Sequence, residues 1–436
     1  MATALGLAAL VAAAPVTAQT PLSLTEAIAR ARAQNPEVGS AAAAEREAAQ
    51  RITQARAGYW PRVDVAESWQ RGNQPVFVFS SVLAQRHFTA ADFAISALNH
   101  PDAVDNVRSS IMVEQSLFDG ATRANVAAAG IGHDMAATTR LMVDQDLVAG
   151  VTAAYGRVLV AAAARESAAA AAETARADRD LAGHRRDAGL VTDADVLQLD
   201  VYLSRTHEQD IRAESDERIA RAQLNQLMGE PLGEAFALDP FPTPTAIDAT
   251  DLTTLEAEAI ANRPDVRLAE LQEALAGATR TAARAAFLPQ VTAQGGWELN
   301  GDAWNTHTSS WVVGAVARIN VFHGFADTAR LAEAREQEKR RALERQTAET
   351  AARLDVHVAV ARLDAARASD AVGRAAVAQA RESRRIIRDR YEAGLTDVSS
   401  LLRATDSVVQ AETQHVAARV AVLAETAALA RTLGRR

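Results

Sequence analysis

The chain contains the stretch Tyr391-Glu392-Ala393-Gly394-Leu395-Thr396, a short break between two very long segments of helical character. A near copy occurs earlier, as Asp187-Ala188-Gly189-Leu190-Val191-Thr192. A glycine flanked by helix on both sides suits a position that needs φ > 0, and Thr396 or Asp397 can cap the helix that follows. Residues 187–192 and about 392–396 are therefore predicted to be the tips of two helical hairpins.

The segment before the second tip is too long for a helix of an ordinary globular core. Residues 327–391 contain no Pro and a single Gly, so a helix of roughly 65 residues, or about 100 Å, is predicted. Its apolar seam recurs at steps of four and three, at Leu354, Val358, Ala361, Ala365, Ala368, Val372 and Ala375. After the tip, a seam recurs every seven residues, at Leu402, Val409, Val416, Leu423 and Ala430. These heptads indicate a closely packed coiled coil, and a simple antiparallel coiled coil satisfies them too.

The chain repeats internally. Pro36 recurs as Pro264 and Pro61 recurs as Pro289, at one constant spacing. Later matches, including the two tips, are closer together, because the first repeat carries an insertion of roughly two dozen residues between Gly72 and Val107. We therefore expect a first repeat over 19–230, a linker over 231–250 and a second repeat over 251–436.

Each repeat predicts the same order of elements: a short helix, a helix of about 20 residues, a strand pair, a long helix, a tip and a return helix. The strands are expected at about 61–70 and 109–118, and at 289–299 and 310–321. In the last pair, alternate residues are apolar on one face and largely polar on the other. This period of two is typical of a sheet with one face in an apolar environment.

Composition limits the possible functions. A net charge of -9 over 436 residues gives no basic footprint for nucleic acid. No Cys is present, and the nine His show no metal-ligand spacing. We find no nucleophilic triad, phosphate loop or carboxylate pair, so an enzyme, a metal site and a cofactor are not expected. Residues 1–18 resemble a secretory signal peptide, although no Lys or Arg precedes Arg30.

The strands suit a membrane pore. Four strands of about 10 residues can cross a bilayer at a tilt, and Trp297 and Trp311 are candidates for an aromatic girdle. Four strands cannot enclose a lumen, so other copies of the chain must complete the barrel. On the alternation alone, a soluble four-stranded sheet with one buried face is the better explanation. However, the long helices leave no amphipathic cover for such a sheet.

In these features the chain resembles the TolC-like outer-membrane factors, or outer-membrane efflux proteins, over nearly its whole length. The resemblance rests on Asn35-Pro36 and Arg263-Pro264, on Trp60-Pro61 and Leu288-Pro289, on Gln115-Ser116-Leu117-Phe118-Asp119-Gly120, and on Ala-Gly-Leu at both tips. The insertion, from Pro75-Val76-Phe77-Val78-Phe79 to Asn99-His100-Pro101, also looks like the extended first loop of one branch of that family. The resemblance implies a homotrimer with a twelve-stranded β-barrel in outer-membrane lipid and a long α-helical barrel across the periplasm.

The resemblance also implies roles for the tips. It places adaptor docking at Ala188, Gly189, Leu190, Thr192, Ala393, Gly394, Leu395 and Thr396. Some family members close the periplasmic entrance with acidic rings, and the corresponding positions here hold Ser400 and Arg403. The remaining candidates for the gate are Asp193, Asp195, Asp397 and Asp406, with Arg388 and Tyr391 as their partners.

The expected function is that of a passive exit duct in the outer membrane. It would work with a periplasmic adaptor protein and an inner-membrane pump of RND or ABC type in a tripartite efflux system. The outer-membrane duct of a type I protein secretion system is the alternative within this class. A periplasmic coiled-coil scaffold that never enters a membrane is the alternative outside it.

Overall fold

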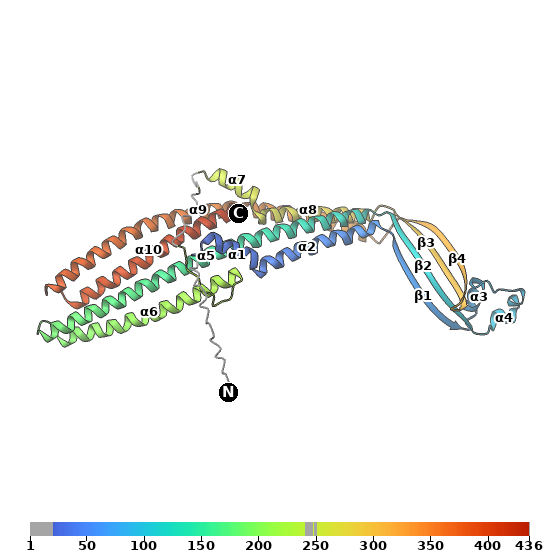
Figure 1. Cartoon of the computed structure of the whole chain (residues 1–436). Helices are drawn as coiled ribbons and strands as arrows, with labels where there is room; N and C mark the ends of the chain where they lie inside the picture. The colour runs from blue at the N-terminus through green and yellow to red at the C-terminus, as the bar shows by residue number, and fades with distance from the viewer. Residues whose placement is uncertain (1–20, 240–246, 248–250, 436) are drawn as a thin grey trace, which may run out of the picture. The chain divides into compact units, whose positions relative to one another are not determined.

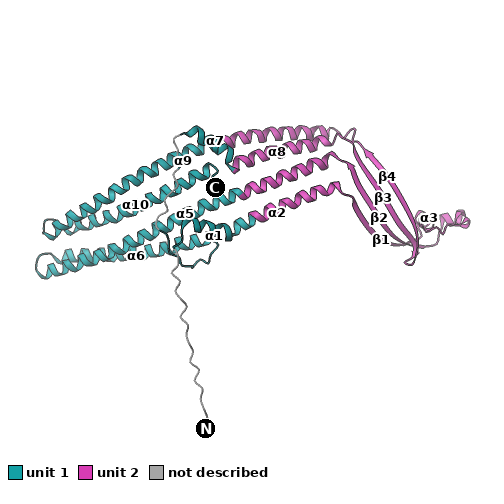
Figure 2. Cartoon of the chain, turned by 45° about the horizontal axis from the view of Figure 1, so that its top comes forward, with its two compact units in different colours: residues 1–40, 141–263, 351–436 teal, residues 41–140, 264–350 magenta. Residues whose placement is uncertain are grey.

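The computed structural model describes residues 21–239, 247 and 251–435 (Figure 1). The predicted signal peptide, residues 1–18, lies outside the described residues, as does part of the predicted linker. Two compact units are present: one comprises 1–40, 141–263 and 351–436, and the other comprises 41–140 and 264–350 (Figure 2). Each unit draws on both sequence repeats, so the units cut across the duplication.

The two repeats have the same order of elements, which confirms the predicted duplication. In the first repeat these elements are α1 (Leu24–Gln34), α2 (Pro36–Arg56), β1 (Arg62–Gly72), β2 (Val104–Phe118), α5 (Gly120–Asp187) and α6 (Asp193–Met228). In the second they are α7 (Leu252–Asn262), α8 (Pro264–Ala285), β3 (Gln290–Ala303), β4 (Thr306–Arg318), α9 (Ala326–Glu392) and α10 (Val398–Thr432). The long helices α5 and α9 have 68 and 67 residues. The first repeat alone has η1 (Ala57–Tyr59) and, between its strands, α3 (Pro75–Ala84), η2 (Ala90–Phe93) and α4 (Ile95–Asn99).

A proline begins the second helix of each repeat. Asn35, the residue before Pro36, is extended, with φ -67° and ψ 124°, because proline disfavours the helical conformation at the position that precedes it. The Asn35 side chain donates a hydrogen bond of 2.9 Å to the carbonyl of Leu227 on α6. The break thus fixes the start of α2 against the end of the return helix.

The four strands form one antiparallel sheet in the order β1-β2-β3-β4, so the two repeats pair through β2 and β3. The predicted strand ends were partly wrong. The strand β2 begins at Val104, five residues before the predicted start, because β1 continues to Gly72 and pairs with it. The strand β4 ends at Arg318 rather than near Val321. Its ladder stops at Gln290, since the preceding Pro289 has no N–H to donate.

The first unit has a core where α1, α5 and α6 meet. Its fully buried residues include Leu22, Val151, Tyr155, Val158 and Leu224. The Tyr155 hydroxyl donates to the carbonyl oxygen of Leu22 at 2.9 Å, and burial raises the pKa of Tyr155 to about 12. By length and composition α5 is the one helix of the described residues apolar enough to cross a membrane. Its apolar residues around Val151 belong to this core.

The predicted seam of α9 faces away from the core of its own chain. All seven residues of that seam, from Leu354 to Ala375, are exposed in the single chain. The buried residues of α9 form a different stripe, also spaced by fours and threes, at Ala352, Val356, Ala359, Leu363 and Ala366. The helix therefore has two apolar stripes on opposite sides, since positions two apart point about 200° apart. On α10, Leu423 of the predicted seam is buried and its other members are half-buried.

We expect the buried stripe to determine the stability of the α9–α10 hairpin. Leu363 is fully buried beside Leu429 of α10 and Leu433, the residue that follows this helix. Replacing Leu363 by Ala should lower the free energy of unfolding by roughly 2–5 kcal/mol, because a cavity adds to the lost transfer energy. Denaturant titration followed by circular dichroism measures this change. Leu190→Ala, at an exposed tip, is the matched control and should cost less than about 0.5 kcal/mol.

Candidate functional site

Both tips use the same left-handed glycine turn. Gly189 has φ +74° and Gly394 has φ +72°, which confirms the predicted positive φ. After each glycine the leucine N–H reaches back to a carbonyl five residues earlier, from Leu190 to Arg185 and from Leu395 to Arg390, at 2.8 Å in both tips. This pair of features is the Schellman end of a helix. The tips are therefore rigid turns of identical geometry.

The helices that leave the tips are capped differently. Thr192 begins α6 in a reciprocal capping box with Asp195, whose carboxylate accepts from the Thr192 N–H at 2.9 Å. Asp397, and not Thr396, caps α10, and it accepts from the Ser400 N–H at 2.7 Å. The Ser400 hydrogen bond lowers the pKa of Asp397. Each cap satisfies backbone donors that would otherwise lack a partner.

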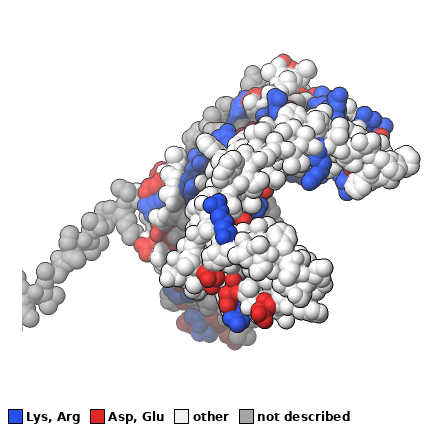
Figure 3. All heavy atoms as spheres, turned by 90° about the vertical axis from the view of Figure 1, so that its right-hand side faces the viewer, with Lys and Arg blue, Asp and Glu red and all other residues white. Residues whose placement is uncertain are grey.

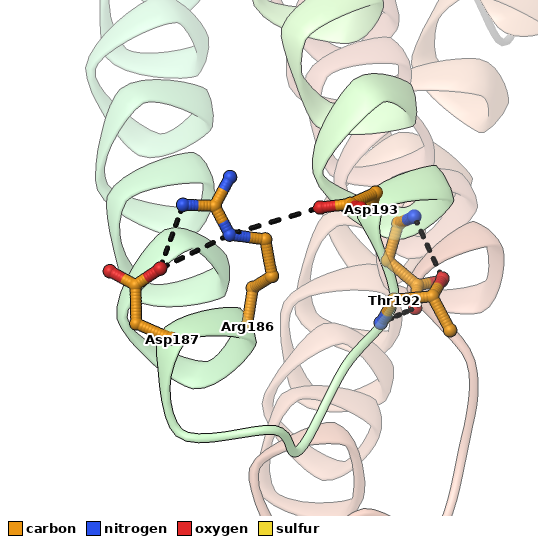
Figure 4. A network of polar contacts seen from close by, with 5 residues as sticks. Arg186, Asp187, Thr192 and Asp193 are labelled. Carbon is orange, nitrogen blue, oxygen red and sulfur yellow. Dashed lines mark hydrogen bonds and ion pairs between the residues drawn. The ribbon is translucent and has the colours of Figure 1, made fainter.

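The apolar residues of the tips point outward. Leu190 is 67% exposed and Leu395 is 68% exposed, with Ala188 and Ala393 exposed beside them. Figure 4 shows the polar side of the first tip, where the Arg186 guanidinium lies between Asp187 and Asp193. Each tip thus offers an unpartnered leucine on a turn fixed by backbone hydrogen bonds.

A small core behind the tips joins the two hairpins. Tyr391 of α9, only 5% exposed, packs with Val196 and Leu199 of α6 and with Val398 and Leu401 of α10. The Arg185 guanidinium lies 5.2 Å from the centre of the Tyr391 ring and donates to the Tyr391 carbonyl oxygen at 3.0 Å. Burial raises the pKa of Tyr391.

The eight gate candidates all lie within a few helical turns of the tips, but one chain does not pair them as expected. Arg388 binds Glu392 at 3.0 Å, and the Tyr391 hydroxyl is buried with no hydrogen-bond partner among the described residues. Asp193 is near Arg186, and Asp195, Asp397 and Ser400 take part in the two helix caps. Arg403 donates to the Ser400 hydroxyl at 3.2 Å.

Asp406 makes the clearest polar link between the hairpins, and the sequence did not identify its partners. Its carboxylate accepts from the Tyr202 hydroxyl at 2.9 Å and from Arg205 at 2.7 Å, both on α6. Burial, together with the Asp406 carboxylate, raises the pKa of Tyr202, so the phenol stays a donor. The chain has only four Tyr. The presence of one of them, Tyr202, on a long and mostly polar helix was the sequence feature that could have indicated a buried contact there.

A groove of about 620 Å³ lies beside this link, between α6 and α10 next to the tips. Two apolar side chains in it, Leu197 and Val201, are 63% and 71% exposed. Its other lining residues are Ala194, Gln198, Tyr202, Arg205, Ser399, Leu402, Arg403 and Asp406. Apolar and charged groups therefore share one surface at the end of the helices.

The sheet of the second unit has one apolar and one polar face. Opposed residues across the strands share a face, so Val65, Ile111, Trp297 and Trp311 form one row. The next row outward is Glu67, Ser109, Leu299 and Ser309, which is mostly polar. The opposite face carries Arg108, Glu114, Gln294, Glu298 and Ser310, and Arg108 binds Glu298 at 2.5 Å. Exposed aromatic residues gather at the other end of the strands, at Tyr59, Trp60, Phe118, Phe287, Phe322 and Phe325.

The sequence matches the family described as outer membrane efflux protein over residues 27–230 and 255–435. Protein CyaE of Bordetella pertussis is 31% identical over 321 residues, which cover 72% of this chain and 68% of that protein. The CmeC outer membrane channel of Campylobacter jejuni has a TM-score of 0.78 at 15% identity, covering 94% of this chain and 85% of that chain. The outer membrane protein VceC of Vibrio cholerae has a TM-score of 0.78 at 19% identity, covering 94% and 96%.

The fold of long helical hairpins combined with a sheet that is apolar on one face is thus shared with these solved outer membrane proteins. The chain belongs to the outer membrane efflux protein family. It spans the outer membrane and extends into the periplasm.

The two faces of the sheet should respond differently to charge. Val313 is 74% exposed on the apolar face, whereas Val316 lies on the polar face opposite Thr292. We expect Val313→Asp or Ala315→Asp to impair membrane assembly, because a charge on a lipid face costs up to about 2–4 kcal/mol near mid-depth. Val316→Asp is the matched control and should be tolerated. Quantification of each variant in outer-membrane fractions tests this, and equal losses from both faces would contradict the assignment.

Proposed function

We propose that three copies of this chain form a passive outer-membrane exit duct of a tripartite efflux system. The tips of the helical hairpins dock onto a periplasmic adaptor protein, and an inner-membrane pump of RND or ABC type supplies the energy. The described residues hold no group of three or more potential metal ligands. In this proposal the chain provides a path for cargo across the outer membrane.

The open edges of the sheet carry this proposal. The strands β1 and β4 each pair on one side only, so the backbone groups of their outer sides have no partner within the sheet. Hydrocarbon offers no partner for such groups, and an open edge is not viable there. A second copy can pair its β4 with β1 of the first, and three copies then close a barrel of twelve strands.

The exposed stripe of α9 supports contact between copies. Leu354 is 63% exposed and Val372 is 70% exposed in the single chain, although both belong to a regular heptad pattern. Such a pattern is typical of a helix that packs against a partner helix. Since the other stripe of α9 already packs within its own chain, the exposed stripe is available to another copy.

The aromatic residues of the second unit support a place for the bilayer. We assign the Trp297–Trp311 row to the outer interface, because the next row outward is polar. The strand from Trp311 to its end at Arg318 rises about 24 Å, or about 17 Å at a tilt near 45°, so the apolar band of about 25 Å of an outer-membrane barrel also takes in residues 319–321, which follow the strand. The aromatic residues at the other end, such as Phe322 and Phe325, then lie at the periplasmic interface.

We assign both the docking surface and the entrance constriction to the tips. Exposed Leu190 and Leu395 on rigid turns offer apolar anchors, and the groove lined by Leu197 and Val201 extends that surface along the helices. The eight gate candidates lie beside it. We place the constriction at these residues, where ionic contacts can form between copies.

Purification tests the duct directly. We expect trimers that dissociate only on heating, recovered from the outer-membrane fraction, and ion conductance in planar bilayers. A soluble monomer without conductance would favour the periplasmic scaffold. Export of a dye and export of a secreted protein, measured with the neighbouring pump genes, separate an efflux duct from a protein secretion duct.

A charge on the exposed α9 stripe should weaken the trimer without unfolding the chain. Val372→Glu places a carboxylate in the proposed contact between copies, and desolvation of that charge costs several kcal/mol unless it is paired. Gel mobility of unheated samples should shift from trimer to monomer. Val372→Ala, which keeps the same exposed site apolar, is the control. A stable trimer in the Val372→Glu variant would place the contact elsewhere.

The tip glycines should be required for docking and not for assembly. Replacing Gly189 or Gly394 by Val forces a β-branched residue into a left-handed conformation, at roughly 1–2 kcal/mol. No atom lies within 4 Å of the added Cβ at either position, so packing is unaffected. The trimer level should stay constant while export of a reporter substrate falls.

Crosslinking separates docking from export. A Cys at Thr396 gives a single reactive site, because the chain has no other Cys. Its crosslink to the adaptor should be lost in the Gly394→Val background and kept in a Gly183→Ala background, where the glycine is helical and has open space around it. Normal export and crosslinking in both tip variants would show that the tips are only turns.

A further inference from the structure

The insertion between β1 and β2 lies on the polar face of the sheet, at its outer end. The side chain of Gln85, which follows α3, donates to the Asn106 side chain at 3.0 Å, and Asn106 donates to Asn300 at 3.2 Å. Thr308 of β4 donates to the Ala84 carbonyl at 2.8 Å. Asn106, Asn300 and Thr308 alternate in step with Arg108, Glu298 and Ser310 on the polar face. Hydrogen bonds thus hold the end of α3 on the polar face of the sheet, and the Trp297–Trp311 row lies on the other face.

These contacts are buried and span three strands. Gln85, Asn106 and Asn300 are 3%, 8% and 3% exposed. Buried amide groups in a mutual hydrogen-bond network hold one geometry, because each lost partner leaves a group unsatisfied. Arg86 adds a hydrogen bond of 3.1 Å to the carbonyl of Ser309. The insertion is therefore a fixed part of the second unit.

Aromatic residues give the insertion its own small core. Phe88 makes edge-to-face contacts with Phe79 and with Phe93, at centroid distances of 5.0 and 4.9 Å. Thr89 and Asp92 form a capping box at η2. These contacts add to the hydrogen bonds with the sheet, and Figure 1 shows the insertion at the end of the strands farthest from the helices of its unit.

The helix α3 presents an apolar stripe away from the sheet. Ser81 and Gln85 are buried on the side that faces the sheet, and the half-buried Phe77 lies against Gly72. Val76 and Leu83, which are 75% and 53% exposed, point to the opposite side, because positions two or five apart on a helix differ by about 140–200°. Phe93 and Ile95, 65% and 76% exposed, extend the apolar surface. Figure 3, which looks at this end, shows a surface with few charged side chains.

We propose that the insertions of three copies contact one another through these stripes and form an apolar outer gate over the lumen. This proposal rests on the trimeric duct proposed above. The occupant of each stripe is the same segment of another copy. Two facts support this: the insertion is held on the polar face of the sheet, and Val76 and Leu83 of α3 stay exposed on the side that points away from the sheet, where Phe88 covers only the neighbouring Phe79.

The dimensions fit. Twelve strands about 4.8 Å apart and tilted by about 40° enclose a barrel about 24 Å across between backbones. Three helices of about 11 Å diameter, side chains included, just fill a circle of that width. A narrow apolar constriction excludes water and ions. Contact between the stripes would therefore close the outer opening of the barrel without salt bridges between copies.

Conductance of purified trimers in planar bilayers tests the gate. Leu83→Asp places three carboxylates in the constriction, and we expect conductance to rise roughly threefold or more as the mouth fills with water. Leu83→Met keeps the same site apolar at a similar size and is the control. Conductance equal to that of the unmodified protein in the Leu83→Asp variant, with normal trimer recovery, would overturn the gate.

A second variant tests the gate without a charged substitution that could disturb folding. Leu83→Cys is conservative, and a short bifunctional maleimide should join copies of the trimer at this position. Trp304→Cys, exposed in the turn between β3 and β4, should give no such crosslink. Absence of crosslinking at Leu83 in a trimer that conducts would refute the gate and leave the duct intact. Absence of trimers and of conductance in every variant would instead refute the proposed function.

Discussion

An unpaired backbone group has no partner in hydrocarbon, and the rest of the structure depends on this constraint. Apolar and polar residues alternate along the strands, but the outer edges of β1 and β4 have no partner strand within the sheet. A single chain in lipid would therefore leave the backbone groups of these two edges unpaired. The exposed heptad stripe of α9 shows the same incompleteness in the helices. The proposed trimer explains both features, because other copies of the chain would pair with the sheet edges and cover the stripe. Exposed apolar surface that would be a liability in a monomer is then ordinary interface.

Close helix packing depends on small residues at particular points. A Cβ at Gly156 of α5 would lie 2.5 Å from a methyl group of Val420, and a Cβ at Gly373 would lie 3.3 Å from the backbone of His415 on α10. The helices therefore approach one another at distances that a larger residue would not allow. In a chain with 4% aromatic residues, contact through small side chains replaces a bulky core.

The sequence was sufficient for the duplication, the tips and the faces of the sheet, because each of these has a local signal. Positive φ at Gly189 and Gly394 follows from glycine between helices, and the alternation of β4 follows from its period of two. The heptad seam of α9 was visible in the sequence, but the second stripe at Ala352–Ala366 was not recognised, since both have heptad spacing and only tertiary contacts show which one packs within the chain. The Tyr202–Asp406 link and the fastening of Gln85 to Asn106 join segments far apart in the sequence. No local pattern encodes such pairs.

The two tips share a glycine turn but differ in the caps that follow, a capping box at Thr192 and a single carboxylate cap at Asp397. In a trimer this difference lowers the symmetry of the periplasmic end. Six hairpins of one kind would present a sixfold ring, whereas six hairpins of two alternating kinds present only a threefold ring. A ring of identical partner molecules around that end would contact two kinds of binding site in alternation. Because the two hairpins belong to one duplicated chain, the sequences of their two binding sites can change independently. In a hexamer of identical single-hairpin subunits, all six sites would change together.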